Sequence, residues 1–289
     1  MQLTQESASS FDALKGRLKK TWTAGDYDKF SRYMERGVRD FHERLNIPPG
    51  SKLLDVACGS GQFALVAARE GADVTGVDIA ANSIAKARMR ANAERLPARF
   101  EEADAENLPF EDGSFDVVVT VIGAMFAPRP EMVAQELLRV CAPGGTIAMA
   151  NWTAEGFVGQ MFRTISKFIA PNGMPSPVMW GNEAIVRERL GAGLSELKLA
   201  RRHYTFDYPF SVHEVVDFFA EYYGPTKTAF ASLEAKEAAR LRDALIQLWA
   251  IHNRGGEDLT ILEAEYLEVI GTRNGSEQTV PGSASFPLC

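Results

Sequence analysis

The sequence is poor in cysteine, has no long apolar run and carries no excess of positive charge. Its three cysteines, Cys58, Cys141 and Cys289, are far apart and form no CxxC pair, which argues against a disulfide framework and a structural zinc site. No segment approaches the roughly 20 apolar residues that span a bilayer, and the first ten residues lack the basic and apolar parts of a secretion signal. We therefore expect a cytoplasmic protein with no membrane span and no bound metal.

The charge balance argues against nucleic acid as a partner. Lysine and arginine number 31 against 38 aspartate and glutamate residues, so the net charge is −7, and no broad cationic face is available for a phosphate backbone. Of the 289 residues, 46% are hydrophobic and 24% are charged, which is typical of a soluble globular protein. The length allows about two domains, or one large α/β domain with insertions.

Apolar runs alternate with helical patterns in the first half of the chain. Apolar residues recur at helical spacing from Tyr27 to Leu45, and proline and glycine end this helix at 48–50. The alternation that follows is typical of a parallel sheet with crossover helices. The predicted strands are 53–57, 74–78, 99–103, 115–121 and 146–150, and the predicted helices between them end at Gly71, begin near Asn82-Ser83 and begin near Pro130.

The pattern changes after Trp152. Two extended segments, 197–208 and 259–272, add late strands, and the remaining segments are helical apart from a proline-rich loop at 171–177. The predicted late helices are 156–169, 183–190, 212–223 and 233–252. We expect a doubly wound, Rossmann-like α/β fold with a seven-stranded, mostly parallel sheet and a helical lid insertion.

The first predicted strand leads into a glycine turn with an acidic residue beside it. The residues are Asp55-Val56-Ala57-Cys58-Gly59-Ser60-Gly61, and glycines at such a turn let a ligand approach the backbone. The turn also satisfies the loose G-x-G-x-x-A pattern of dinucleotide-binding proteins, and a tight turn without a ligand would look the same. Because Asp55 would repel a pyrophosphate but suits an ammonium or sulfonium group, it favours a cationic cofactor over NAD.

Two further carboxylates follow predicted strands. Asp78 ends the second strand, where it can accept hydrogen bonds from both ribose hydroxyls of a nucleoside, or simply cap the next helix. Asp104 follows the third strand and is placed to accept from an adenine amine. Three carboxylates at neighbouring strand ends favour one ligand site.

Four stretches together resemble the class I S-adenosylmethionine-dependent methyltransferases, and among them the group similar to the ubiquinone/menaquinone C-methyltransferases. Residues 54–61 look like the first motif of the family, 77–79 like its acidic second motif, 104–116 like its third and fourth, and 138–145 like its closing motif. The resemblance covers about residues 50 to 152. More loosely, the two late strands resemble the terminal antiparallel hairpin of the family.

The resemblance implies S-adenosyl-L-methionine as cofactor and assigns its contacts. Glycines of the turn and Asp55 would face the methionine part, Asp78 the ribose, and 104–106 the adenine. Residues just past the fourth strand would lie near the sulfonium, and two tyrosines of the first helix would close over it, although core packing also explains both. The full set of implied cofactor residues is Asp55, Ala57, Gly59, Ser60, Gly61, Asp78, Ile79, Asp104, Ala105, Glu106, Val121, Ile122, Tyr27 and Tyr33.

The chemistry of the expected reaction makes few demands on the protein. A sulfonium methyl group is already activated, so transfer needs in-line alignment and exclusion of water. A phenol or enol carbon as acceptor requires a base, whereas an amine or phenolate does not. His252, at the end of a predicted helix, is the candidate catalytic residue, although a surface or capping role is the commoner one for such a histidine. The aromatic-rich segments 152–180 and 204–230 suit a lid over an apolar acceptor or a dimer interface.

We therefore expect a methyltransferase that acts on a small aromatic or apolar molecule, as a monomer or homodimer. Its expected parts are an N-terminal helical segment (1–49), the S-adenosylmethionine-binding core (50–152), lid insertions with the final strands (153–272) and a disordered tail (273–289). A non-catalytic protein that binds S-adenosylmethionine would carry the same motifs. An NAD-dependent oxidoreductase is the other alternative, which Asp55 and the Asp104 stretch oppose.

Overall fold

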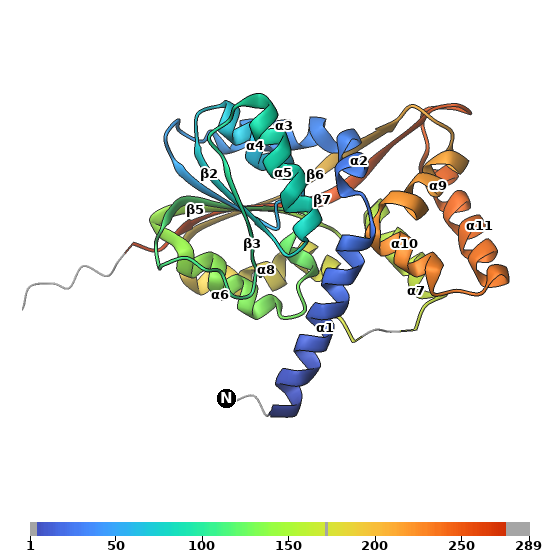
Figure 1. Ribbon diagram of the computed structural model, residues 1–289, viewed down its shortest axis with the longest axis horizontal. Coiled ribbons are helices and arrows are strands. Elements are labelled where there is room, and N and C mark those ends of the chain that lie inside the picture. The colour runs from blue at the N-terminus through green and yellow to red at the C-terminus, as the bar shows by residue number, and fades with distance from the viewer. Residues whose placement is uncertain (1–4, 171–172, 276–289) are drawn as a thin grey trace, which may run out of the picture.

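Seven strands form one sheet within the part of the computed structural model that is described, residues 5–170 and 173–275 (Figure 1). Their order in the sheet is β3-β2-β1-β4-β5-β7-β6. Strands β1 to β5 pair in parallel, whereas β7 is antiparallel to both β5 and β6. The strands are β1 (Lys52–Val56), β2 (Asp73–Asp78), β3 (Arg99–Glu102), β4 (Phe115–Val121), β5 (Cys141–Trp152), β6 (Leu194–Tyr208) and β7 (Thr260–Arg273). The predicted Rossmann-like sheet with an antiparallel hairpin is confirmed.

The order of the strands reverses between β1 and β4. From β1 the chain moves outward to β2 and β3, and it then returns to β4 on the other side of β1. Such a reversal separates the two crossover connections and leaves a crevice at the carboxyl ends of the two central strands. The topology alone therefore selects the place where a ligand can enter the sheet.

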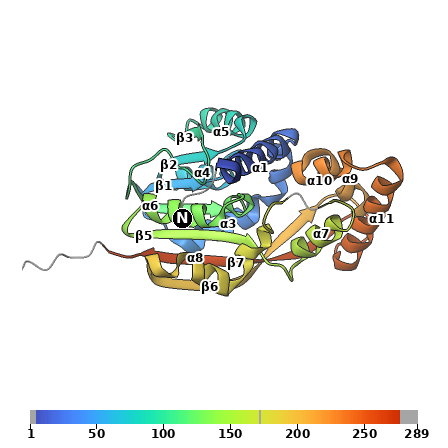
Figure 2. The ribbon, with the colours of Figure 1, turned by 90° about the horizontal axis from the view of Figure 1, so that it is seen from below.

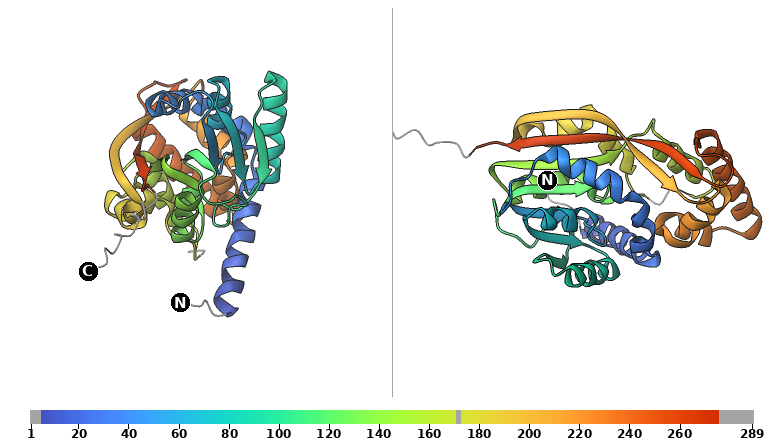
Figure 3. Two further views of the ribbon diagram at one scale, coloured as in Figure 1. Left: turned by 90° about the vertical axis from the view of Figure 1, so that its left-hand side faces the viewer. Right: turned by 90° about the horizontal axis from the view of Figure 1, so that it is seen from above.

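Helices cover both faces of the sheet. Figure 1 shows α3, α4 and α5 on one face and α6 and α8 on the other, while α7, α9, α10 and α11 gather beyond one end (Figure 2). The right view of Figure 3 shows β6 (yellow) and β7 (red) side by side along one edge. The helices are α1 (Gln5–Ala24), α2 (Tyr27–Ser31), α3 (Glu35–Leu45), α4 (Gln62–Arg69), α5 (Ala81–Glu94), α6 (Pro130–Val140), α7 (Phe157–Ser166), α8 (Glu183–Leu190), α9 (Val212–Tyr222), α10 (Gly224–Ala231) and α11 (Ala235–His252).

The parallel strands are buried because helices cover both of their faces. Leu53 and Leu54 of β1, and Val118 and Val119 of β4, have no exposed surface. Continuous apolar runs of this kind are typical of central strands in α/β proteins, which is why these strands were predictable from the sequence.

Several elements differ from the sequence-based expectation. Helices α1 and α10 were not predicted, and a 3-10 turn at Arg32–Met34 interrupts the predicted first helix. Helix α5 begins at Ala81 without a side-chain cap, because the Asp78 carboxylate already accepts a hydrogen bond from the N–H of Ala80. Asn82 and Ser83 therefore lie inside the helix.

Strand β5 is longer than the predicted 146–150. It begins at Cys141 and runs through Pro143-Gly144-Gly145, where its register against β4 shifts. Gly144 has a φ of 76°, so the predicted turn is present as an irregularity within the strand. Of the predicted tail, Arg273 belongs to β7, and residues 276–289, with Cys289, lie outside the described residues.

Aromatic rings hold the end helices to the sheet. Trp249 of α11 is fully buried, and its ring centroid lies 4.6 Å from that of Phe157 on α7 and 5.0 Å from that of Phe219 on α9. It also stacks on Phe206 of β6 with centroids 6.2 Å apart. Each such ring pair adds roughly 0.5–1.5 kcal/mol to the gain from burial.

Replacing Trp249 by alanine should therefore lower the free energy of unfolding by about 3–5 kcal/mol, because it opens a large cavity among three helices and a strand. Ile251 lies on the same helix and is 80% exposed, so Ile251→Ala is the control and should change stability by less than about 0.5 kcal/mol. Urea denaturation measures both. Similar losses in the two variants would contradict the packing described here.

Candidate active site

A pocket opens at the carboxyl ends of β1, β2 and β4, at the reversal of strand order. Its walls are α1, the segment from α2 to α3, the turns after β1 to β4, and one residue of β6. The residues that line it are Lys15, Leu18, Trp22, Tyr27, Ser31, Met34, Val38, Asp55, Ala57, Cys58, Gly59, Gln62, Phe63, Asp78, Ile79, Ser83, Ala103, Asp104, Ala105, Val121, Ile122, Gly123, Ala124, Phe126, Ala127, Pro128 and Tyr204.

The turns after β1 and β4 contain strained backbone. Ala57 and Ile122 have φ angles of 57° and 54°, a region that non-glycine residues enter at a cost of about 1–3 kcal/mol each. Between them, Gly123 packs so closely that a Cβ atom there would lie 2.5 Å from the carbonyl oxygen of Ala57. The two turns therefore touch through backbone atoms, and Gly123 has no room for a side chain.

Asp78 connects the glycine turn to β2. Its Oδ2 accepts a hydrogen bond from the N–H of Gly59 at 2.9 Å, and its Oδ1 accepts one from the N–H of Ala80 at 2.8 Å. Burial raises the pKa of the carboxyl, although the bonds from Ala80, Gly59 and Ile79 oppose the rise. Because each carboxylate oxygen has two lone pairs, Asp78 can accept further bonds from a ligand in the pocket.

Asp55 is the most deeply buried carboxylate in the pocket, at 1% exposure. Burial raises its pKa to about 8, opposed by a hydrogen bond from the N–H of Ala64 and increased by the nearby Asp78. A carboxyl with this pKa carries a proton at pH 7 unless a positive group stands near it. The pocket thus presents a buried acid that a cationic ligand would ionise.

Tyr27 lies directly over the glycine turn. A Cβ atom at Gly59 would come within 2.8 Å of the tyrosine ring, so glycine is needed there for the helix to approach. Burial raises the pKa of the Tyr27 phenol, and Asp78 and Asp55 raise it further. The phenol is therefore neutral at physiological pH and can donate a hydrogen bond.

Ion pairs surround the far side of the pocket, after β3. Asp104 accepts from the N–H of Glu106 at 2.9 Å and pairs with Lys15. The carboxylate of Glu106 is completely buried and accepts from the backbone N–H and the Nε of Arg129, at 2.6 and 2.7 Å, and from Nζ of Lys15 at 2.7 Å. Glu106 is thus neutralised by two cations of the protein.

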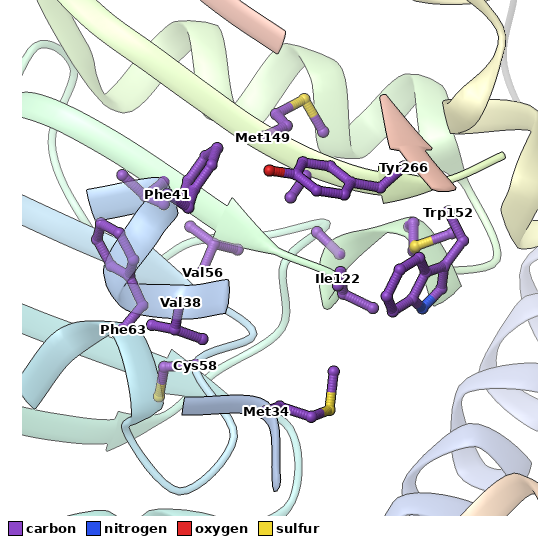
Figure 4. Packing of buried hydrophobic residues seen from close by; sticks show 14 of the residues in the cluster. Met34, Val38, Phe41, Val56, Cys58, Phe63, Ile122, Met149, Trp152 and Tyr266 are labelled. Carbon is purple, nitrogen blue, oxygen red and sulfur yellow. The ribbon is translucent and has the colours of Figure 1, made fainter. Parts of the chain in front are cut away.

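The other half of the pocket is apolar. Met34 and Val38 approach Ile122 from the N-terminal segment (Figure 4). Tyr204 of β6 joins them, and its hydroxyl donates to the carbonyl oxygen of Met34. Burial raises the pKa of the Tyr204 phenol well above its usual range. This half therefore offers apolar and neutral surfaces around the end of β4.

Most of the expected cofactor residues meet in this pocket. Those that line it are Tyr27, Asp55, Ala57, Gly59, Asp78, Ile79, Asp104, Ala105, Val121 and Ile122. They come from the ends of four parallel strands and from α2. These segments are far apart in the sequence, and the predicted sheet topology is what brings the strand ends together.

Three of the expected residues lie behind the pocket wall. Glu106 is enclosed by Lys15 and Arg129. Gly61 begins α4 with a φ of 84° and packs against α5 and β3, where a Cβ would lie 3.2 Å from Phe100. Ser60 is buried, and its hydroxyl accepts from Nε2 of Gln62 at 2.6 Å. These residues support the turn and do not line the pocket.

Tyr33 and His252 are also outside the pocket lining. Tyr33 packs against Tyr208 and Phe218, with ring centroids 5.0 and 5.5 Å away. It packs as a core residue, which was the alternative to a cofactor contact. His252 ends α11, where Nε2 lies 3.3 Å from Oε1 of Gln160 and the ring meets Phe157 edge-on. Its helix packs on α7 rather than over the pocket, and the expectation of a catalytic role has no geometric support.

The sequence analysis missed the contribution of α1. Lys15, Leu18 and Trp22 lie on one side of this helix and line the pocket. The segment is polar and its apolar residues form only a weak helical pattern, so the sequence does not indicate a buried face. The spacing of three and then four residues between Lys15, Leu18 and Trp22 is the one feature that would place them on the same side of a helix. Phe126 was missed because it belongs to no recognisable motif, and Tyr204 was expected only as part of the aromatic-rich segment 204–230.

Neither a metal centre nor a membrane span accompanies this pocket. No group of histidine, cysteine and acidic residues suited to a metal ion occurs among residues 5–170 and 173–275. Within the same ranges, no helix is long and apolar enough to cross a bilayer.

Comparisons with known proteins agree with this geometry. A family model described as a methyltransferase domain matches residues 54–149. An uncharacterised protein of Mycobacterium tuberculosis H37Rv is 41% identical over 254 residues, covering 85% of this chain and 90% of the relative. The methyltransferase GfsG of Streptomyces halstedii is 38% identical over 125 residues, 42% of this chain and 45% of that protein.

The chain belongs to the class I S-adenosylmethionine-dependent methyltransferases. A solved structure with the same fold is phosphoethanolamine N-methyltransferase 2 of Haemonchus contortus in complex with S-adenosyl-L-methionine. The TM-score is 0.54 at 17% identity, over 83% of this chain and 53% of that one. The cofactor of the protein is S-adenosyl-L-methionine.

The pocket suits that cofactor. Gly59 lines the pocket without a side chain, and Asp78 retains free lone pairs beside it. Asp55 is a buried acid that forms no ion pair with the described residues and accepts from the N–H of Ala64, and an ammonium or sulfonium group would stabilise its ionised form.

Replacing Asp78 should weaken cofactor binding. Asp78→Ala removes the expected ribose acceptor and leaves the N–H groups of Gly59 and Ala80 without their partner, so we expect S-adenosylhomocysteine to bind roughly ten- to a hundredfold more weakly. Asp78→Asn keeps one carbonyl acceptor and should lose less. Calorimetric titration of both variants measures the effect, and an unchanged affinity of Asp78→Ala would mean that Asp78 only holds the N–H groups of Gly59 and Ala80.

Stability should fall with rising pH because of Asp55. Its folded pKa of about 8 lies above the unfolded value of 3.8, so its contribution is fully present below pH 3.8 and is lost as the pH rises toward 8. Asp55→Asn should flatten the pH dependence of unfolding between these values. Asp40, an exposed acid on α3, provides the control Asp40→Asn, and equal pH profiles for the two variants would contradict the assignment.

Proposed function

We propose that this protein transfers a methyl group from S-adenosylmethionine to a small aromatic or otherwise apolar acceptor. The observation that carries the proposal is the division of the pocket into a polar half and an apolar half that meet at Val121 and Ile122. The carboxylates at the ends of β1, β2 and β3 belong to the first half. Aromatic and aliphatic side chains form the second.

The polar half supplies the cofactor contacts in this proposal. Asp78 would accept hydrogen bonds from the ribose, Asp55 would face the amino end of the methionine part, and Asp104 with Ala105 would border the adenine. Gly59, which has no side chain, lets the ligand approach the backbone of the turn. When bound, S-adenosylmethionine supplies a methyl group on a sulfonium, which is activated for transfer.

The apolar half would hold the acceptor and exclude water. Trp22 and Phe126 meet edge to face, with centroids 5.0 Å apart, and Met34 and Tyr204 complete the wall. Rings of this kind bind flat apolar molecules well because they bury a large area at low conformational cost. Fixed walls also hold the nucleophile in line with the methyl group, which is the main requirement of this chemistry.

Tyr27 and Tyr204 place phenol groups near this boundary. Burial raises the pKa of both phenols, so each is a hydrogen-bond donor rather than a base. Tyr204 already donates to Met34, and this bond fixes the ring against the 3-10 turn. Tyr27 would orient a ligand by donating its hydroxyl proton into a hydrogen bond.

Turnover tests the proposal directly. The purified protein is incubated with S-adenosylmethionine carrying a labelled methyl group and with a metabolite extract, and labelled products are separated by polarity. We expect the label in an apolar product, with Asp78→Ala as the control that removes it. Binding of S-adenosylhomocysteine without any labelled product would instead favour a non-catalytic protein that binds the cofactor.

Phe126 provides a test of the acceptor half once an acceptor is identified. Phe126→Ala should raise the KM for an apolar acceptor by roughly tenfold, because the substitution removes one aromatic wall, and it should leave the affinity for S-adenosylhomocysteine within about twofold. Phe110, a half-buried ring that does not line the pocket, supplies the control Phe110→Ala. Equal effects of the two variants on KM would place the acceptor elsewhere.

A further inference from the structure

Helix α1 covers the cofactor pocket with one face. Lys15, Leu18 and Trp22 line the pocket at a spacing of three and four residues, which places them on one side of the helix. Figure 1 shows the first half of α1 extending away from the sheet. The helix therefore meets the pocket through its second half.

Two of the three lysines of α1 pair with acidic residues at the end of β3 and just after it. Lys19 pairs with Glu102, and Lys15 pairs with both Asp104 and Glu106. Burial alone would lower the pKa of Lys15, but its hydrogen bonds to Asp104 and Glu106 outweigh this and leave the pKa raised. Lys15 is thus a cation at physiological pH.

This edge would carry an excess of negative charge without α1. Its three carboxylates, Glu102, Asp104 and Glu106, are matched by Lys15, Lys19 and, outside the helix, Arg129. Arg129 also lies 5.5 Å from the ring centroid of Phe11 on α1. Most of the neutralising charge therefore comes from the helix that covers the pocket.

The opposite end of α1 is attached in a different way. After the helix, Gly25 approaches Tyr222 so closely that a Cβ would lie 2.3 Å from its carbonyl oxygen, and the N–H of Asp26 donates to that oxygen at 3.1 Å. Gly224 makes an equally close backbone contact with Thr21. Backbone contacts fix this end, whereas ion pairs hold the part over the pocket.

We propose that Lys15 is a positioning residue for the cofactor, which fastens α1 over the side of the pocket where adenine is expected, and that the cofactor leaves only when the ion pairs of Lys15 and Lys19 break. The inference rests on the cofactor pocket of the proposed function, and it is independent of which acceptor is methylated. Lys15 acts through Asp104, because its ammonium holds that carboxylate at the pocket wall.

Ion pairs with exposed members are screened by salt, whereas backbone and apolar contacts are not. Lys19 and Glu102 are 46% and 44% exposed, and Lys15 and Asp104 are 17% and 30% exposed. A rate that depends on breaking these pairs must therefore increase with ionic strength. Dissociation limited by the apolar contacts of Leu18 and Trp22 would not.

Stopped-flow fluorescence of S-adenosylhomocysteine dissociation tests the proposal without an acceptor. Trp22 lines the pocket on α1 itself, whereas Trp152, Trp180 and Trp249 are at least 97% buried away from it, so the signal reports on the covering helix. We expect the dissociation rate of the wild-type protein to rise severalfold between about 50 and about 500 mM KCl. Lys15→Met should dissociate about tenfold faster at low salt and lose part of this salt dependence, because the exposed pair of Lys19 with Glu102 remains.

Two further variants separate positioning from general effects. Lys15→Arg keeps the charge and should restore most of the wild-type rate. Lys20→Met removes one positive charge from an exposed position of the same helix and should leave the rate unchanged. A salt-independent rate in the wild type, or equal rates for Lys15→Met and Lys20→Met, would overturn this inference alone. Failure of the wild type to bind S-adenosylhomocysteine would overturn both this inference and the proposed function.

Discussion

The contact between the turn after β1 and the turn after β4 sets the shape of the pocket. Gly123 meets the carbonyl of Ala57 at a distance that admits no side chain, and Ala57 and Ile122 are both in the left-handed region of backbone conformation. Strain of this size persists only where the surroundings enforce it. Here the adjacent central strands enforce it, because they bring the two turns together where the chain reverses direction across the sheet. A wider contact would merge the polar and apolar halves of the pocket.

Two carboxylates on the polar side of this contact have no cation of the described lining residues beside them. Asp55 and Asp78 lose solvation on burial, and their raised pKa values express that loss. Among the described lining residues the cation is Lys15, which pairs with Asp104 on the far side. A ligand with positive charge near Asp55 would stabilise the ionised acid, and the acid would stabilise the ligand in turn. Ionisation of Asp55 is thus unfavourable in the free protein and becomes favourable when a positively charged ligand is bound.

The parts that could be predicted from the sequence are those whose signal is local. Buried parallel strands appear as apolar runs, and Asp55, Gly59, Asp78 and Asp104 follow such runs directly, so the topology brings them together. Glu106 lies beside Asp104 in the same motif, but only the folded structure shows that Arg129 and Lys15 enclose it. Tyr27 and Tyr33 occur on the same predicted helix, yet Tyr27 begins α2 and lines the pocket, whereas Tyr33 lies in the 3-10 turn and packs outside the pocket. Helix α1 has no apolar pattern, and its role depends on ion pairs across 80 to 90 residues.

The apolar half of the pocket, where we propose that the acceptor binds, includes an element beyond the matched methyltransferase domain, which ends at residue 149. Tyr204 reaches the pocket from β6, and its ring fits against Gly37, where a Cβ would lie 2.4 Å away. Behind it, Trp152 and Phe206 continue the aromatic packing toward Trp249 and the end helices. A change of residues in those helices can therefore shift Tyr204 in the apolar wall without touching the expected cofactor contacts. Because the apolar wall combines residues of α1, of the 3-10 turns and of β6 that follow no common motif, the motifs of the core identify the cofactor but not the acceptor.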